Sequence, residues 1–105
     1  DHRDLHSFPT RRSSDLDVIG LLQNKGANVD YHDPYIPHIH HETDGWHMDS
    51  VKDMMKSVKD SDAVIIITNH KAYDYEEIVH AAKFVFDSRN ATRKISKGSN
   101  KVVRL

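Results

Sequence analysis

Polar side chains that can bind a ligand directly follow two apolar runs of this sequence. The runs cover residues 63–67 and 84–86 and are rich in valine, isoleucine and phenylalanine. The polar residues are Thr68, Asn69 and His70 after the first run, and Arg89 after the second. A guanidinium group can form two parallel hydrogen bonds to phosphate oxygens, while hydroxyl, amide and imidazole groups bind polar atoms singly. These types indicate recognition of a polar, anionic ligand.

Each of these residues also has a structural interpretation. Arg89 can instead pair with Asp87 or another local carboxylate, and residues 68–70 can instead hold neighbouring loops or a subunit interface. The local sequence does not separate these alternatives. The ligand contacts of both groups are therefore hypotheses.

Asp33 is a third polar candidate, because it stands between the strand-like residues 28–32 and Pro34. Its carboxylate can accept hydrogen bonds from the following backbone in an Asx turn, or it can contact a ribose hydroxyl. Proline cannot continue a strand ladder, so the segment must end here. The Asx turn is the simpler expectation.

Five histidines lie close together in the sequence, which raises the question of a metal site. They are His32, His38, His40, His41 and His47. Imidazole suits zinc or nickel, but Pro37 disfavours the helix that would align histidines four residues apart, and no cysteine joins them. We therefore expect a solvated loop over residues 34–46 and no metal site.

The composition excludes several classes of function. The chain has 105 residues and a formal net charge of −1, so neither nucleic acid nor a membrane is an expected partner. There is no cysteine, glycine-rich phosphate loop or GxSxG motif, so we predict no catalytic residue in this chain. A cysteine-free chain suits a reducing compartment, and we expect the protein to be cytoplasmic.

The order of the elements predicts an α/β fold that holds these residues in place. Apolar spacing predicts helices over residues 16–26, 49–58 and 75–82, with Gly26 as a C-cap and Asp74 as an N-cap. Short apolar runs predict strands over residues 28–32, 63–68, 83–87 and 101–105. Such alternation requires right-handed crossovers and a mostly parallel sheet, here a Rossmann-like three-layer domain. A fold of this kind begins with a strand, and we expect that first strand to be missing.

Residues 1–16 have a different character from the rest of the chain. They show no helical or strand periodicity, and residues 6–16, HSFPTRRSSDL, resemble the translation of a common short-read sequencing adapter. We interpret residues 1–16 as an artefactual, adapter-derived segment and residues 17–105 as the domain proper. The alternative is a genuine disordered basic arm. On the first interpretation, the natural protein continues upstream of Asp17.

Three blocks of sequence together resemble the C-terminal domain of the nucleotide-sugar dehydrogenases. The blocks are IGLLQNKGANVDYHDPYIP, SDAVIIITNHKAYDYEEIV and FVFDSRNATR, followed by the terminal KVVRL. These enzymes are the UDP-glucose and UDP-N-acetylhexosamine 6-dehydrogenases. The variants VDYHDPYIP, TNHKAYDY and DSRNAT look most like the UDP-N-acetylglucosamine branch.

The resemblance implies a function in which this chain supplies only one part. The family oxidises the sugar C6 hydroxyl to a carboxylate in two NAD-dependent steps, through a covalent intermediate on a cysteine, and serves polysaccharide biosynthesis. An N-terminal domain, absent here, binds NAD, whereas the C-terminal domain helps to bind the UDP-sugar. The family's Asp-x-Arg arginine corresponds to Arg89, which implies UDP contact. The full-length enzyme is expected to be a homo-oligomer and this fragment to be inactive alone.

Two other interpretations compete with this one. The chain can be a standalone flavodoxin-like or receiver-like binding module, in which case Asp33 is the one candidate phosphoacceptor, although it lacks acidic neighbours. It can also be a histidine-rich metal-binding protein.

Overall fold

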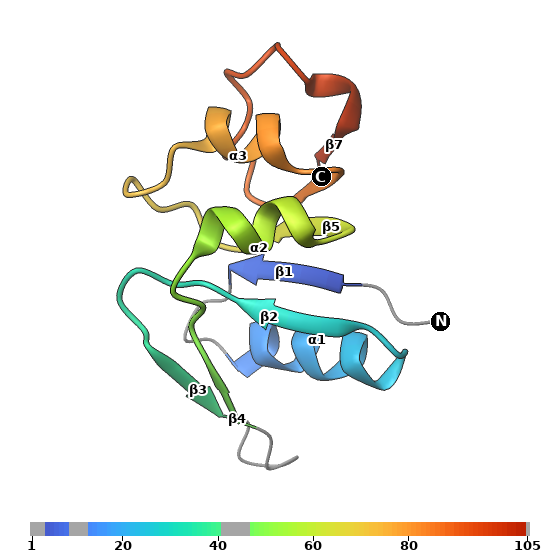
Figure 1. Cartoon of the computed structure of the whole chain (residues 1–105), viewed down its shortest axis with the longest axis vertical. Coiled ribbons are helices and arrows are strands. Elements are labelled where there is room, and N and C mark those ends of the chain that lie inside the picture. Colours follow the sequence, from blue (N-terminus) through green and yellow to red (C-terminus); the bar gives the residue numbers. More distant parts are fainter. Residues whose placement is uncertain (1–3, 9–12, 41–46, 105) are drawn as a thin grey trace.

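The computed structural model describes the backbone of residues 4–8, 13–40 and 47–104, and the side chains of residues 16–40 and 47–104 (Figure 1). Strands and helices alternate along most of the chain. In order, the elements are β1 (Asp4–Phe8), α1 (Ser13–Asn24), β2 (Asn28–Tyr31), β3 (His38–His40), β4 (His47–Asp49), α2 (Met54–Asp60), β5 (Ala63–Ile66), α3 (Tyr75–Ala81), β6 (Val85–Asp87), the 3-10 turn η1 (Ser99–Lys101) and β7 (Val102–Arg104).

Five strands form one parallel sheet in the order β2-β1-β5-β6-β7. The chain moves from β1 to β2 on one side, and from β5 through β6 to β7 on the other. The order therefore reverses between the neighbours β1 and β5, and such a switch point opens a crevice at the carboxyl ends of the strands. The predicted Rossmann-like α/β fold is confirmed.

The prediction that the first strand is missing is wrong. β1 occupies the centre of the sheet, where Leu5 pairs with Val29 on one side and with Ala63 on the other. Five residues of the segment interpreted as adapter-derived thus form a strand. Backbone pairing on both edges does not require an alternating side-chain pattern, which is why periodicity missed it. Residues 1–3 and 9–12 of that segment lie outside the described residues.

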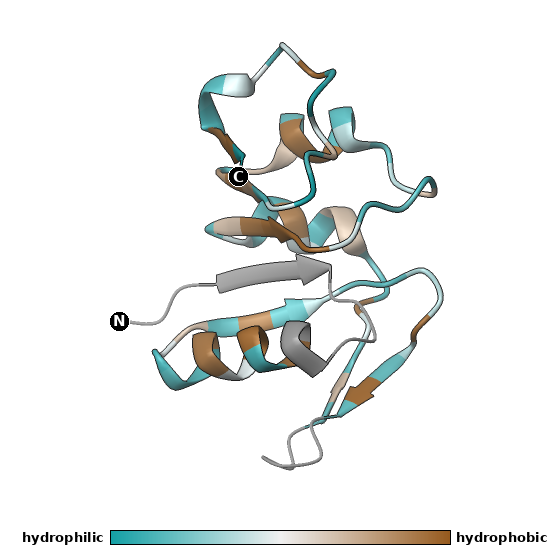
Figure 2. Ribbon diagram, turned by 180° about the vertical axis from the view of Figure 1, so that it is seen from behind, coloured by the Kyte–Doolittle hydropathy of each residue, from teal (hydrophilic) through white to brown (hydrophobic). Residues whose placement is uncertain are grey.

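Two hydrophobic cores lie on opposite faces of the sheet. α1 covers one face, where Ile19 packs with Tyr31 and Ile39. α2 and α3 cover the other face, where eight of the residues with described side chains form a buried cluster that includes Val58 and Ile78. Figure 2 shows the hydrophobic β5 between these layers, in contrast to the hydrophilic loops around it. This arrangement gives the three layers that the sequence predicts.

Local capping signals set the helix ends. Gly26 has φ 94°, a left-handed conformation that glycine adopts without strain after α1. The Asp74 carboxylate accepts a hydrogen bond from Glu77 N–H, which confirms the predicted N-cap of α3. The predicted start of the second helix at residue 49 is wrong, because Asp53 caps α2 by accepting from Lys56 N–H.

The expected loop over residues 34–46 is partly wrong as well. Residues 38–40 form β3, which pairs antiparallel with β4 in a separate two-stranded sheet. The buried face of this hairpin contributes Ile39 to the α1 core. Residues 41–46 lie outside the described residues. Among the helices that the structure describes, none is long and apolar enough to cross a membrane.

Candidate functional site

The carboxyl ends of β5 and β6 form a level edge of the sheet. Their register pairs Ile66 with Asp87, so the following loops leave the sheet side by side. Ser88 joins the loops, since its N–H and its hydroxyl both donate to the Ile66 carbonyl, at 3.1 and 2.6 Å. The polar residues predicted from the sequence are therefore brought together at one edge.

Asp87 organises the loop after β6. Its side chain is fully buried, and its carboxylate accepts hydrogen bonds from the N–H groups of Arg89, Ala91 and Thr92 and from the Thr92 hydroxyl, at 2.6–3.1 Å. Burial by itself would raise the pKa of Asp87, but these hydrogen bonds outweigh burial and lower the pKa. Asn90 completes the turn with a left-handed φ of 57°.

Arg89 is held at the edge without an ion pair to Asp87. Its Nε donates to the Ile67 carbonyl at 2.7 Å, so the side chain bridges the loops after β6 and β5. Among the described side chains this is the one hydrogen bond recorded for the guanidinium, and Arg89 is exposed. The pairing with Asp87 considered from the sequence involves only the Arg89 backbone. The Nη groups are thus available to an anion.

The loop after β5 is fixed by a tyrosine from α3. The Tyr75 hydroxyl accepts from the His70 N–H at 2.8 Å and donates to the Thr68 carbonyl at 3.4 Å. Burial raises the pKa of Tyr75, so its hydroxyl stays protonated and able to donate. Asn69, between the two, is exposed.

Two buried polar atoms of this loop lack hydrogen-bond partners among the described residues. They are Thr68 Oγ1 and His70 Nε2. The nearest acidic group to His70 Nε2 is the Asp33 carboxylate, at 3.6 Å, which is beyond hydrogen-bond length. Buried polar atoms in folded proteins nearly always have a hydrogen-bond partner. Two such atoms without partners, next to the switch point of the sheet, indicate a place for a ligand.

Asp33 itself forms the expected Asx turn. Its Oδ1 accepts from the N–H groups of Tyr35 and Ile36 at 2.8 and 3.1 Å, and the residue is buried. This carboxylate is engaged in the turn, which does not favour a phosphoacceptor role. The ribose contact has no support from these distances.

Sequence inspection missed three residues that support the site. Tyr73 bonds His32, with its hydroxyl 2.7 Å from Nδ1, and stacks edge-on against His70 with ring centroids 5.8 Å apart. Tyr75 holds the β5 loop as described. Arg104 of β7 donates to Thr92 Oγ1 and to the Thr92 carbonyl at 3.0 and 2.7 Å. Arg104 lies in the predicted final strand, but the sequence does not show that it would bond Thr92.

Comparison with protein families gives a match that covers most of the chain. Residues 7–94 match the UDP binding domain of the UDP-glucose/GDP-mannose dehydrogenase family. The chain belongs to this family. The resemblance found in the sequence is thus confirmed, and no curated protein or solved structure gives a significant match.

This UDP-binding domain does not fit a dinucleotide. A nicotinamide cofactor, which a dehydrogenase family suggests for the whole enzyme, requires closely spaced glycines in the first strand-to-helix turn. The four glycines of the chain are Gly20, Gly26, Gly45 and Gly98, too far apart for GxGxxG. None lies between β1 and α1.

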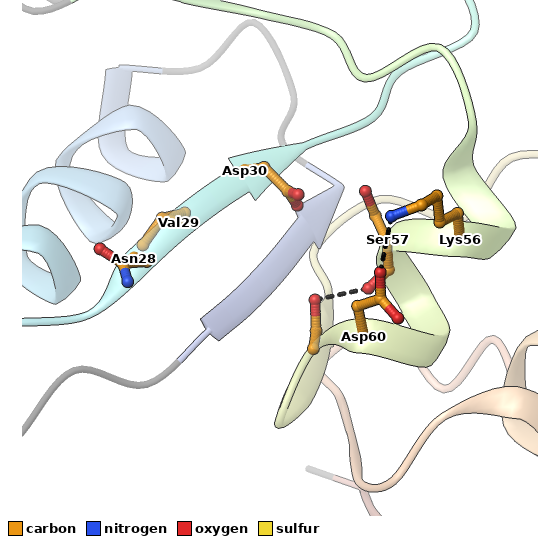
Figure 3. A pocket seen from close by; sticks show the side chains of 7 residues that line it. Asn28, Val29, Asp30, Lys56, Ser57 and Asp60 are labelled. Carbon is orange, nitrogen blue, oxygen red and sulfur yellow. Dashed lines mark hydrogen bonds and ion pairs between the residues drawn. The ribbon is translucent and has the colours of Figure 1, made fainter.

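A separate hollow of about 300 Å³ lies between β2 and α2 (Figure 3). Its polar groups are engaged with each other, since Lys56 Nζ bonds the Asp60 carboxylate at 2.9 Å and the Ser61 hydroxyl donates to the Ser57 carbonyl at 2.6 Å. The carboxyl end of α2 lies against the start of β2 here, away from Arg89 and His70. We do not assign the nucleotide to it.

Proposed function

We propose that this domain binds the UDP portion of a UDP-N-acetylhexosamine in an NAD-dependent 6-dehydrogenase. The observation that carries the proposal is the exposed Arg89 guanidinium, anchored through Nε to Ile67 at the carboxyl edge of the sheet. Anchoring one face of the group orients the remaining N–H donors, which match a phosphate oxygen pair. Arg89 is the proposed diphosphate ligand.

The unpaired atoms of the β5 loop complete the proposed site. Thr68 Oγ1 and His70 Nε2 are buried without hydrogen-bond partners among the described residues, and the exposed Asn69 lies between the two residues in sequence. We propose that these three residues contact polar groups of the nucleotide or sugar. The ligand would then remove the desolvation cost of the unpaired atoms, which favours binding.

Titration of the chain with UDP in a calorimeter tests Arg89. Arg89→Ala should weaken binding by about 1.5–3 kcal/mol, the usual contribution of a charge-assisted hydrogen bond. Arg89→Lys should also weaken it, because a lysine cannot both reach Ile67 and present a fork. Arg93→Ala, an exposed arginine of the same loop, is the matched control and should leave binding unchanged. Equal affinity of wild type and Arg89→Ala would remove Arg89 from the site.

The sugar and the reaction require the complete enzyme. We propose two molecules of NAD reduced per UDP-N-acetylglucosamine, since oxidation of an alcohol to a carboxylate releases four electrons. The chain has no cysteine for the covalent intermediate, so we propose that this fragment alone is inactive. The whole enzyme is proposed to be cytoplasmic and homo-oligomeric. A complete enzyme that oxidised UDP-glucose but not UDP-N-acetylglucosamine would contradict the proposed substrate.

We further propose that residues 1–16 are translated adapter and that the domain proper spans residues 17–105. The eleven residues HSFPTRRSSDL support this origin. Genomic DNA around codon 17, read without adapter ligation, should encode a different upstream sequence. Recovery of the codons for residues 6–16 from such DNA would contradict the proposal.

A further inference from the structure

The β3–β4 hairpin gathers imidazole and carboxylate groups on one exposed face. Cross-strand pairing sets His38 opposite Asp49 and His40 opposite His47. These four residues are exposed, whereas Ile39 on the opposite face is buried in the α1 core. Alternation along each strand therefore places all four side chains on the solvent side.

Three of these side chains already converge. His38 Nδ1 is 2.7 Å and His47 Nε2 is 3.5 Å from Asp49 Oδ1, and ligand atoms from the three residues all lie within 4.8 Å of one another. The His38 and His47 rings stack with centroids 6.0 Å apart. Around a tetrahedral zinc ion with bonds of about 2.0–2.1 Å, donor atoms are about 3.4 Å apart. Small rotations of exposed side chains would bring these atoms to that spacing.

We propose that His38, His47 and Asp49 bind one Zn²⁺ ion on the face of this hairpin. Two imidazoles and a carboxylate form a ligand set that zinc accepts, with a fourth position open to water or to His40. Magnesium and calcium prefer all-oxygen sites, so the set selects against them. Helical spacing in the sequence gives no sign of this cluster, because His38 and His47 lie nine residues apart and come together only through the antiparallel pairing of β3 with β4.

The fold already restricts the backbone of these ligands. Met48 packs at the edge of the α1 core and Ile39 inside it, which fixes the register of both strands. The Ser50 N–H also donates to the Pro37 carbonyl at 2.9 Å and closes the base of the hairpin. The ion would therefore order side chains rather than the main chain. Because it binds the folded state, zinc should also raise the unfolding temperature.

Calorimetric titration of the chelator-treated, dialysed chain with ZnCl₂ tests the proposal. We expect saturable binding of one Zn²⁺ and none of Mg²⁺ or Ca²⁺. Loss of an outer-shell group commonly weakens metal binding about 10- to 100-fold, so His47→Ala and Asp49→Asn should each weaken it at least ~10-fold. His80→Ala, which alters an exposed histidine of α3, is the matched control.

Two results would contradict a specific zinc site. Absence of saturable binding would overturn the proposal, as would one-to-one binding that both variants leave unchanged. Circular dichroism spectra of the variants should match the wild type, since the altered side chains face solvent. UDP affinity should be the same in both variants, because the hairpin face does not include Arg89 or His70.

Discussion

The Asp87 carboxylate links the stability of the site to pH. It is fully buried, it accepts four hydrogen bonds, and its folded-state pKa is lowered from the ordinary value of 3.8. The unfolded chain therefore takes up the proton first as the pH falls. The stabilisation by ionised Asp87 is complete above the unfolded pKa and is lost as the pH falls through the lower, folded pKa.

Asp87→Asn should remove this dependence and destabilise the fold. The amide presents one acceptor oxygen and an NH₂ group to donors that the carboxylate satisfies, so the free energy of unfolding should fall by about 1–3 kcal/mol at neutral pH. Urea unfolding measured between pH 3 and pH 7 provides the test. Glu76→Gln, at an exposed position of α3, is the control. An unchanged stability at neutral pH in Asp87→Asn would contradict the described network.

Thr68→Val separates a binding role from a structural one. The hydroxyl has no hydrogen-bond partner among the described residues, and its replacement by a methyl group should leave the unfolding temperature unchanged or raise it. If Thr68 contacts the ligand, the same variant should bind UDP or the UDP-sugar more weakly by about 0.5–1.5 kcal/mol. Thermal unfolding and calorimetry on one preparation measure both. A loss of stability without a loss of affinity would assign Thr68 to the fold.

At this scale the sequence predicts which residues lie at the edge but not how they are held. Arg89 and residues 68–70 are located correctly because strand ends are local features. The bond from Arg89 to Ile67 and the approach of Asp33 to His70 join residues 22 and 37 positions apart. Such pairs depend on sheet order, which local pattern does not specify.

At the scale of elements, α3 positions the β5 loop. Its N-cap Asp74 lies between Tyr73 and Tyr75, which both contact His70. Asp74→Ala should lower the free energy of unfolding by about 0.5–2 kcal/mol, the usual effect of losing an N-cap. Chemical denaturation measures this, with Lys71→Ala in the exposed loop as the control. A full wild-type stability would show that the cap does not support α3.

Features that depend on neighbouring residues are predicted better than features that depend on residues distant in sequence. The cap at Asp74 and the left-handed turn at Gly26 are determined by a few neighbouring residues, and both are confirmed. The β3–β4 hairpin and the late start of α2 were not predicted. Asp49 pairs with His38 across the hairpin, and the N–H groups of Ser50 and Val51 donate to the carbonyls of Pro37 and Tyr31. These long-range contacts keep residues 49–51 out of the helix that their apolar spacing predicts.

At the scale of the whole molecule, β1 holds the two halves of the sheet together. It pairs with β2 on one edge and β5 on the other. A chain that begins at Ser13 should lose cooperative unfolding, because both neighbours would expose unpaired backbone edges. Thermal unfolding followed by circular dichroism tests this, with removal of residues 1–3 alone as the control. An unchanged transition would show that the central strand is dispensable, whatever the origin of its codons.

The two cores on opposite faces of the sheet also differ in the number of described residues that they bury. Among the side chains that the structure describes, the α1 side has three buried core residues, whereas the α2–α3 side has eight. Local opening requires less free energy where fewer apolar contacts must be broken. The α1 side should therefore exchange its amide hydrogens through partial openings that leave β5, β6 and the proposed nucleotide edge closed. Local opening on the α1 face would then not disturb the proposed ligand contacts of Arg89 and Thr68, which lie at the carboxyl edge of the sheet.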